Sequence, residues 1–211
     1  YNRIKDNPNA DIQPRTVIFA GKAAPGYYMA KLIIKLINSI ADVINNDKQI
    51  NDKLKVIFLA NYSVSLAETI IPAADLSEQI STAGMEASGT GNMKFQMNGA
   101  LTIGTLDGAN IEILEEVGAD NIFIFGKTAE QIIEMRKNGY RPADYYNSDI
   151  NLKRVIDMIK NNYFSKNEPG IFEPIVSNLL NNDYYFHNAD FADYINTQKK
   201  VEDLYQNQDL W

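Results

Sequence analysis

Short apolar runs alternate with amphipathic stretches along the first 126 residues of the chain. Runs of β-branched, aliphatic and aromatic residues are typical of buried parallel strands. Between the first two runs, apolar residues recur at helical spacing and leave polar residues on the opposite face. The pattern predicts strands at 16–20, 54–60, near 79–80, 101–103 and 122–125, and helices at about 32–44, 65–71, 90–97 and from 109.

Strands that alternate with helices predict an α/β fold with an open, mostly parallel sheet. We expect a doubly wound, Rossmann-like sheet of about five strands, whose first sixty residues form one β-α-β unit. In such a sheet ligands bind at the carboxyl ends of the strands. The segment 86–94 is predicted to lie on that edge.

The pattern changes after Gly126 to helices alone. Thr128 and Gln131 have the spacing of a capping box, which predicts the start of one helix. Apolar residues at helical spacing predict three more helices, around 152–159, 172–179 and 191–205. We therefore expect a single domain over 1–211, with an α/β core at 1–126 and a helical extension at 127–211.

The segment Glu86–Lys94 combines a glycine-rich turn with the start of a predicted helix. Gly89 and Gly91 let the backbone turn tightly and approach a ligand closely. Thr90 and Asn92 suit the non-helical start of a helix. Free N–H groups at a helix start bind phosphate or carboxylate groups. The segment is therefore a candidate anion site.

Lys94 lies about one turn inside this helix and is the only basic residue between Lys55 and Lys127. The acidic residues of the same stretch are Glu68, Asp75, Glu78, Glu86, Asp107, Glu112, Glu115, Glu116 and Asp120. An amine beside a phosphate cradle suggests an aldehyde cofactor held as a Schiff base, and pyridoxal phosphate fits that description. A lysine that is merely exposed after a glycine-rich loop has the same spacing. Spacing alone therefore does not distinguish a cofactor-binding lysine from an ordinary surface lysine.

Composition narrows the function classes. The net charge of -7 and isoelectric point of about 4.8 argue against nucleic acid and against an anionic membrane surface. The chain has no cysteine, which excludes a disulfide framework and a thiolate metal site. A single histidine, His187, suggests neither a histidine-rich metal site nor a Ser-His-Asp triad, so we predict no metal site. No apolar run reaches the ~18–20 residues of a membrane span, and residues 1–5 do not form a signal peptide.

The identities of the residues are more informative than their spacing. Along essentially its whole length the chain resembles the α-glucan phosphorylases, which comprise the glycogen, starch and maltodextrin enzymes. The segments that carry the resemblance are 21–27, 61–62, 71–84, 98–110 and, most specifically, Glu-Ala-Ser-Gly-Thr-Gly-Asn-Met-Lys at 86–94. Subunits of that family are several times longer. The resemblance therefore implies a fragment of the C-terminal, glycosyltransferase-B-type domain that binds pyridoxal phosphate.

The resemblance implies a role for each cofactor-binding position. Lys94 carries pyridoxal phosphate covalently. Thr90 and Gly91, together with Gly89, hold its phosphate group. Tyr62 matches a tyrosine near the cofactor ring, although a serine follows it here where animal members carry arginine.

The resemblance also implies a sugar-binding half of the loop. Glu86, Ala87, Ser88 and Gly89 match positions that hold hydroxyl groups of the transferred glucosyl unit. Glu86 and Lys94 are accordingly the residues expected to take part in catalysis.

The reaction that the resemblance implies is phosphorolysis of an α-1,4-glucan by inorganic phosphate, which yields glucose 1-phosphate. In the family the cofactor phosphate exchanges a proton with substrate phosphate, which is general acid catalysis. The resemblance also implies that the N-terminal domain completes the cleft, that the full-length enzyme is a homodimer, and that its location is cytoplasmic. We expect the isolated chain to be inactive and its pyridoxal phosphate occupancy to be weak or nil.

Two other functions stay open at this point. A nucleotide-sugar glycosyltransferase donor domain shares the doubly wound fold and places an acidic residue near a sugar. The chain could also be a folded fragment without ligand or activity. The glycine-rich loop at 21–26 is not a Walker loop, because two tyrosines follow it in place of lysine and a hydroxyl residue.

Overall fold

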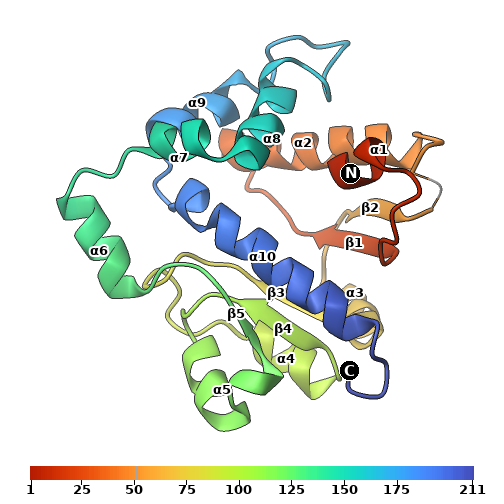
Figure 1. The fold of residues 1–211 in the computed structure, drawn as a ribbon, viewed down its shortest axis with the longest axis vertical. Coiled ribbons are helices and arrows are strands. Elements are labelled where there is room, and N and C mark those ends of the chain that lie inside the picture. The colour runs from red at the N-terminus through yellow and green to blue at the C-terminus, as the bar shows by residue number, and fades with distance from the viewer. Residues whose placement is uncertain (51) are drawn as a thin grey trace. The chain divides into compact units, whose positions relative to one another are not determined.

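A computed structural model describes residues 1–50 and 52–211 (Figure 1). The chain divides into two compact units, each built from two segments of the sequence. The first unit comprises Tyr1–Ser63 and Arg154–Ser177, and the second comprises Val64–Lys153 and Asn178–Trp211. The boundary between Ser63 and Val64 lies at the start of a helix, and the other two boundaries fall inside helices α8 (Ile150–Lys160) and α9 (Glu173–Asn181).

The first unit contains the predicted β-α-β arrangement. Strands β1 (Arg15–Ala20) and β2 (Leu54–Leu59) pair in parallel, with Arg15 opposite Leu54 and Ala20 opposite Leu59. Helix α2 (Tyr28–Asn45) connects them, and a short helix α1 (Asn2–Asp6) precedes them. One buried apolar cluster of this unit comprises Ile4, Ala41, Ile44, Ile50 and Val56.

Strand β1 corrects one detail of the sequence prediction. It was expected to be buried, but none of its residues is, and Ile18 and Phe19 are 46% and 40% exposed. Within the described part of the chain, β1 pairs only with β2. An apolar run is buried in a parallel sheet only where neighbouring strands and helices cover it, and β1 has a strand on one side alone.

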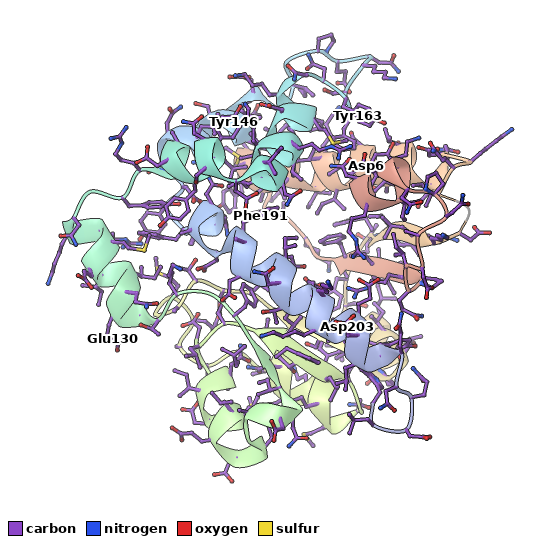
Figure 2. The ribbon with its side chains drawn as sticks, in the orientation of Figure 1. Asp6, Glu130, Tyr146, Tyr163, Phe191 and Asp203 are labelled. Carbon is purple, nitrogen blue, oxygen red and sulfur yellow. The ribbon has the colours of Figure 1, made fainter. Side chains whose placement is uncertain are left out.

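Polar contacts join the two segments of the first unit. Arg154 donates to both carboxylate oxygens of Asp6, at 2.5 and 2.8 Å, and this guanidinium lowers the pKa of the Asp6 carboxyl. The hydroxyl groups of Tyr1 and Tyr163 lie 2.6 Å apart. Figure 2 shows the Asp6 and Tyr163 side chains. The segment from Arg154 thus belongs to the unit formed by the start of the chain.

The second unit holds a parallel sheet in the order β3-β4-β5, formed by Leu76–Gln79, Leu101–Gly104 and Phe123–Ile124. Its helices are α3 (Val64–Ile70), α4 (Gly91–Met97), α5 (Asn110–Val117), α6 (Ala129–Lys137), α7 (Pro142–Ser148) and α10 (His187–Tyr205). Two short 3-10 turns lie at Ile71–Ala73 and Ala119–Asn121. Helix α10 packs on this sheet, since Val201 joins Ile103 and Phe125 in one buried cluster (Figure 1).

The α/β class, the five strands and their parallel pairing are confirmed. The strands do not form one ladder, however. Hydrogen bonding divides the described strands into a two-stranded sheet and a three-stranded sheet, one in each unit. The short β5, with two residues, shows how little of the last apolar run enters the ladder.

The helical region after Gly126 is also confirmed. Thr128 caps α6, and its side chain and that of Gln131 make both bonds of a capping box. Helix α7, which begins at Pro142, was not predicted. In the part of the chain that the structure describes, no helix is both long and apolar enough to cross a membrane.

Candidate functional site

The segment 84–94 follows the carboxyl end of β3, on the sheet edge predicted from the sequence. Its residues Glu86, Ala87, Ser88 and Thr90 are exposed. Gly89 has a φ of +76°, a left-handed conformation that favours glycine. The loop then enters α4. An exposed loop at this edge is where ligands of α/β sheets bind.

The first turn of α4 brings the Lys94 amine close to the start of the helix. Thr90 is the N-cap residue, and its side chain makes no capping hydrogen bond. The amide oxygen of Asn92 accepts from the Met93 backbone N–H at 2.9 Å. Lys94 is exposed, and its Nζ lies 3.3 Å from Thr90 Oγ1. The amine and the uncapped helix start are therefore adjacent.

A buried carboxylate lies beneath the first half of the loop. Asp107, in the turn between β4 and α5, is 3% exposed. Its Oδ1 accepts from the Gly84 backbone N–H at 2.7 Å, and its Oδ2 accepts from the Glu86 backbone N–H at 3.0 Å. Ser81 Oγ also donates to Oδ2, at 2.5 Å. The carboxylate thus receives donors from three positions on the neighbouring loop.

The next residues of the same turn contact the middle of the loop. The Ala109 backbone N–H donates to the Ser88 carbonyl oxygen at 2.6 Å. A Cβ atom at Gly108 would lie 2.4 Å from that oxygen, and Gly108 has a φ of +51°. Both the close approach and the conformation require glycine here.

A pair of buried amides holds the start of α4. Asn110 and Asn92 are each 2% exposed, and Asn92 Nδ2 donates to Asn110 Oδ1 at 3.0 Å. Asn110 Nδ2 in turn donates to the Thr105 carbonyl oxygen at 3.0 Å. The first turns of α4 and α5 are thereby connected through side chains with satisfied polar groups.

The second unit gathers all the predicted site residues except one. Glu86, with Ala87, Ser88 and Gly89, and Lys94, with Thr90 and Gly91, belong to one continuous loop and helix start. Tyr62 belongs to the first unit, where it follows β2 and is 39% exposed. Asp107 and Asn110, both buried, were not predicted to have a structural role, although they belong to a run of small and polar residues directly after a strand. Asn92 was expected to suit the non-helical start of the helix, but it lies inside α4 and is buried against Asn110.

His187 is the first residue of α10. Its ring lies 5.8 Å from that of Tyr185, and its backbone N–H donates to Asp183. Within the described residues, no group of three or more histidine, cysteine, aspartate or glutamate side chains is arranged to hold a metal ion.

Comparison with known proteins gives a consistent result. A family model described as carbohydrate phosphorylase matches residues 1–211. The glycogen phosphorylase of Synechocystis is 58% identical over 211 residues, which cover 100% of this chain and 25% of that protein. The liver form of human glycogen phosphorylase is 57% identical with the same coverage, and the Chlamydia pneumoniae enzyme is 57% identical over 212 residues, 26% of its length. The chain thus spans about a quarter of these relatives.

Proposed function

Because the chain belongs to the carbohydrate phosphorylase family, we propose that it provides the cofactor-binding half of the active site of an α-1,4-glucan phosphorylase. The reaction transfers a terminal glucosyl unit to inorganic phosphate, which yields glucose 1-phosphate and a glucan one unit shorter. The observation that carries the proposal is the adjacency of the Lys94 amine and the uncapped start of α4, at 3.3 Å from Thr90 Oγ1.

The residues of this loop fit pyridoxal phosphate. An aldehyde cofactor needs an accessible primary amine, and Lys94 is exposed. A phosphate group needs hydrogen-bond donors, which the Thr90 hydroxyl and the backbone of Gly91 provide at the helix start. Helix α4 has only seven residues, so its dipole contributes little beyond these local donors. We assign Lys94 as the attachment point and Thr90, Gly91 and Gly89 as the phosphate-binding residues.

Glu86 and its neighbours form the other half of the proposed site. A carboxylate accepts hydrogen bonds from sugar hydroxyl groups, and these bonds are stronger than bonds between neutral groups. Glu86, Ala87 and Ser88 are exposed and therefore accessible to a sugar. We propose that this half binds the glucosyl unit while the α4 half binds the cofactor. We propose that Tyr62 contacts the cofactor ring.

When bound, the phosphate group of pyridoxal phosphate supplies an acid that acts through substrate phosphate on the glycosidic oxygen. Two neighbouring phosphate groups need positive charge, and a helix start provides only about half an elementary charge. We propose that a preceding domain of the same polypeptide supplies the additional cations and the glucan groove, and that the complete enzyme is a cytoplasmic homodimer.

Peptide mapping tests the assignment of Lys94. Borohydride reduction of the intact holoenzyme, followed by proteolysis, should place the pyridoxyl group on Lys94. Lys22 and Lys127 serve as internal controls, because each lies in a loop and neither follows the motif. A label on either of them would refute the assignment. Tight calorimetric binding of a nucleoside diphosphate without cofactor absorbance would instead indicate a nucleotide-sugar glycosyltransferase.

A further inference from the structure

Asp107 is a buried carboxylate with no direct part in the proposed reaction. Burial of a charged group is costly unless hydrogen bonds compensate it. Here the two oxygens accept from the backbone N–H groups of Gly84 and Glu86, on either side of Met85. Bonds to an ionised acceptor are stronger than bonds between neutral groups. Asp107 therefore fixes the backbone from which the Glu86 side chain extends.

We propose that Asp107 is a positioning residue, which orients Glu86 toward the glucosyl unit by holding the Glu86 backbone N–H. This inference rests on the proposed function for the role of Glu86. The Glu86 side chain is exposed, so the backbone beneath it sets the direction in which it extends. The Ser88 contact to Ala109 anchors the other end of the sugar-binding segment to the same turn.

The role requires a carboxylate. Each oxygen of Asp107 accepts from a different backbone N–H group, at 2.7 Å and 3.0 Å. An amide of the same shape has one acceptor oxygen, and its NH₂ group would face a donor. Asp107→Asn therefore breaks one of the two loop contacts while it preserves the volume of the side chain.

The cofactor half of the site has a separate support. Asn92 in the first turn of α4 is held by Asn110, and neither residue contacts the Asp107 carboxylate through a hydrogen bond in the described part of the chain. Loss of the Asp107 contacts should therefore disturb the sugar half and leave the cofactor half in place. This difference separates a positioning role from a general loss of folding.

A double-mutant cycle in the intact protein tests the inference. We expect Asp107→Asn to lower kcat/KM by about tenfold to a hundredfold, as loss of a Glu86 contact would. In a Glu86→Gln background the same change should cost less than about threefold, because the two residues act through one contact. The absorbance spectrum and content of the cofactor should not change. The positioning role would be overturned if Asp107→Asn lowered kcat/KM equally in the wild-type and Glu86→Gln backgrounds. It would also be overturned if the variant lost its cofactor together with its activity.

Hydrogen exchange gives a readout that does not depend on activity. The Glu86 and Gly84 amides should exchange faster in Asp107→Asn, whereas the Ala109 amide should not. Ser81→Ala is the matched control, since it removes the side-chain donor to Asp107 and leaves both backbone contacts. Unchanged Glu86 exchange in Asp107→Asn would refute the positioning role even in an active enzyme. Absence of phosphorolysis in the intact wild-type protein would instead refute the proposed function. The exchange comparison would still show whether Asp107 holds the Gly84 and Glu86 backbone.

Discussion

At the scale of residues, exposed and buried polar groups have different tasks. The exposed members of the loop, such as Glu86 and Lys94, are free to meet a ligand. The buried members Asp107, Asn110 and Asn92 bond to one another or to backbone groups of the loop. Buried polar groups with satisfied hydrogen bonds favour a single conformation. The site thus combines an accessible loop with a fixed polar base.

Glu86→Gln should impair sugar binding without loss of cofactor. The change replaces a charged acceptor with a neutral amide of similar size. Hydrogen bonds to charged groups contribute about 1.5–3 kcal/mol, so kcat/KM should fall by about tenfold to a hundredfold if the bond forms in the transition state. Steady-state kinetics and the cofactor absorbance of the intact enzyme measure the two effects.

Lys94→Ala provides the contrasting variant, because it should remove the cofactor itself. If Glu86→Gln lost pyridoxal phosphate but retained its affinity for sugar, the division of the loop into two halves would be wrong.

At this scale the sequence identifies the candidate loop but not the buried residues that support it. Glycine-rich spacing and an isolated lysine identified the segment 86–94. The hydrogen bonds of Asp107 join positions 81, 84 and 86 across a strand and a helix. Such contacts depend on the register of β3 against β4 and on the tight turn at Gly108. Neither is encoded in local periodicity.

At the scale of elements, α6 shows a local signal that the structure bears out. Thr128 accepts from the Gln131 backbone N–H at 3.3 Å, and Gln131 Oε1 accepts from the Thr128 N–H at 3.0 Å. The Glu130 backbone N–H and, to a smaller extent, the Thr128 hydroxyl also lower the pKa of the Glu130 carboxyl. Glu130 projects from the first turn of α6 (Figure 2). The start of this helix is therefore stabilised by several polar contacts.

Thr128→Ala should destabilise the first turn of α6 by about 0.5–2 kcal/mol, the typical contribution of a capping side chain. Hydrogen exchange at the Gln131 amide of the intact protein measures the effect. Since the pKa of Glu130 is lowered in the folded state, its stabilising contribution is complete above the ordinary value of 4.5 and is lost as the pH falls below it. The difference in Gln131 amide exchange between Thr128→Ala and the wild type should therefore become smaller as the pH falls below 4.5.

Ser148→Ala is the matched control, because Ser148 donates to the Tyr145 carbonyl at the end of a helix and caps no N–H group. An equal effect of the two substitutions on Gln131 exchange would contradict the role of the cap.

Elements with strong periodicity were predicted well, and two short helices were missed. Helix α2 and α10 carry apolar residues over several turns, whereas α1 and α7 have five and seven residues and little pattern. Strand β1 was identified by its β-branched and aromatic residues, but its burial was not. Burial depends on what covers a strand, and this information lies outside the strand itself.

At the scale of the whole molecule, sequence order does not follow the compact units. The first unit takes Arg154–Ser177 from within the region that sequence pattern assigned to a helical extension. Contacts such as Arg154 with Asp6 and Lys35 with Glu168 link positions far apart in the chain. The division at 126 into an α/β core and a helical extension stays a prediction, which rests on the order of strands and helices along the sequence. Local periodicity does not predict long-range contacts of this kind.

Charge balance predicts that the 211-residue chain by itself performs no phosphorolysis. Two phosphate dianions held side by side repel each other, and a helix start offsets only about half an elementary charge. Lys94 is the only basic residue between Lys55 and Lys127, and its amine is the proposed attachment point. The purified chain, shown to be folded by circular dichroism, should therefore release no glucose 1-phosphate from glucan, phosphate and pyridoxal phosphate. The Lys94→Ala chain, prepared identically, reports any contaminating host enzyme. Release by the wild-type chain above that background would show that the cations needed for the reaction already lie within these residues.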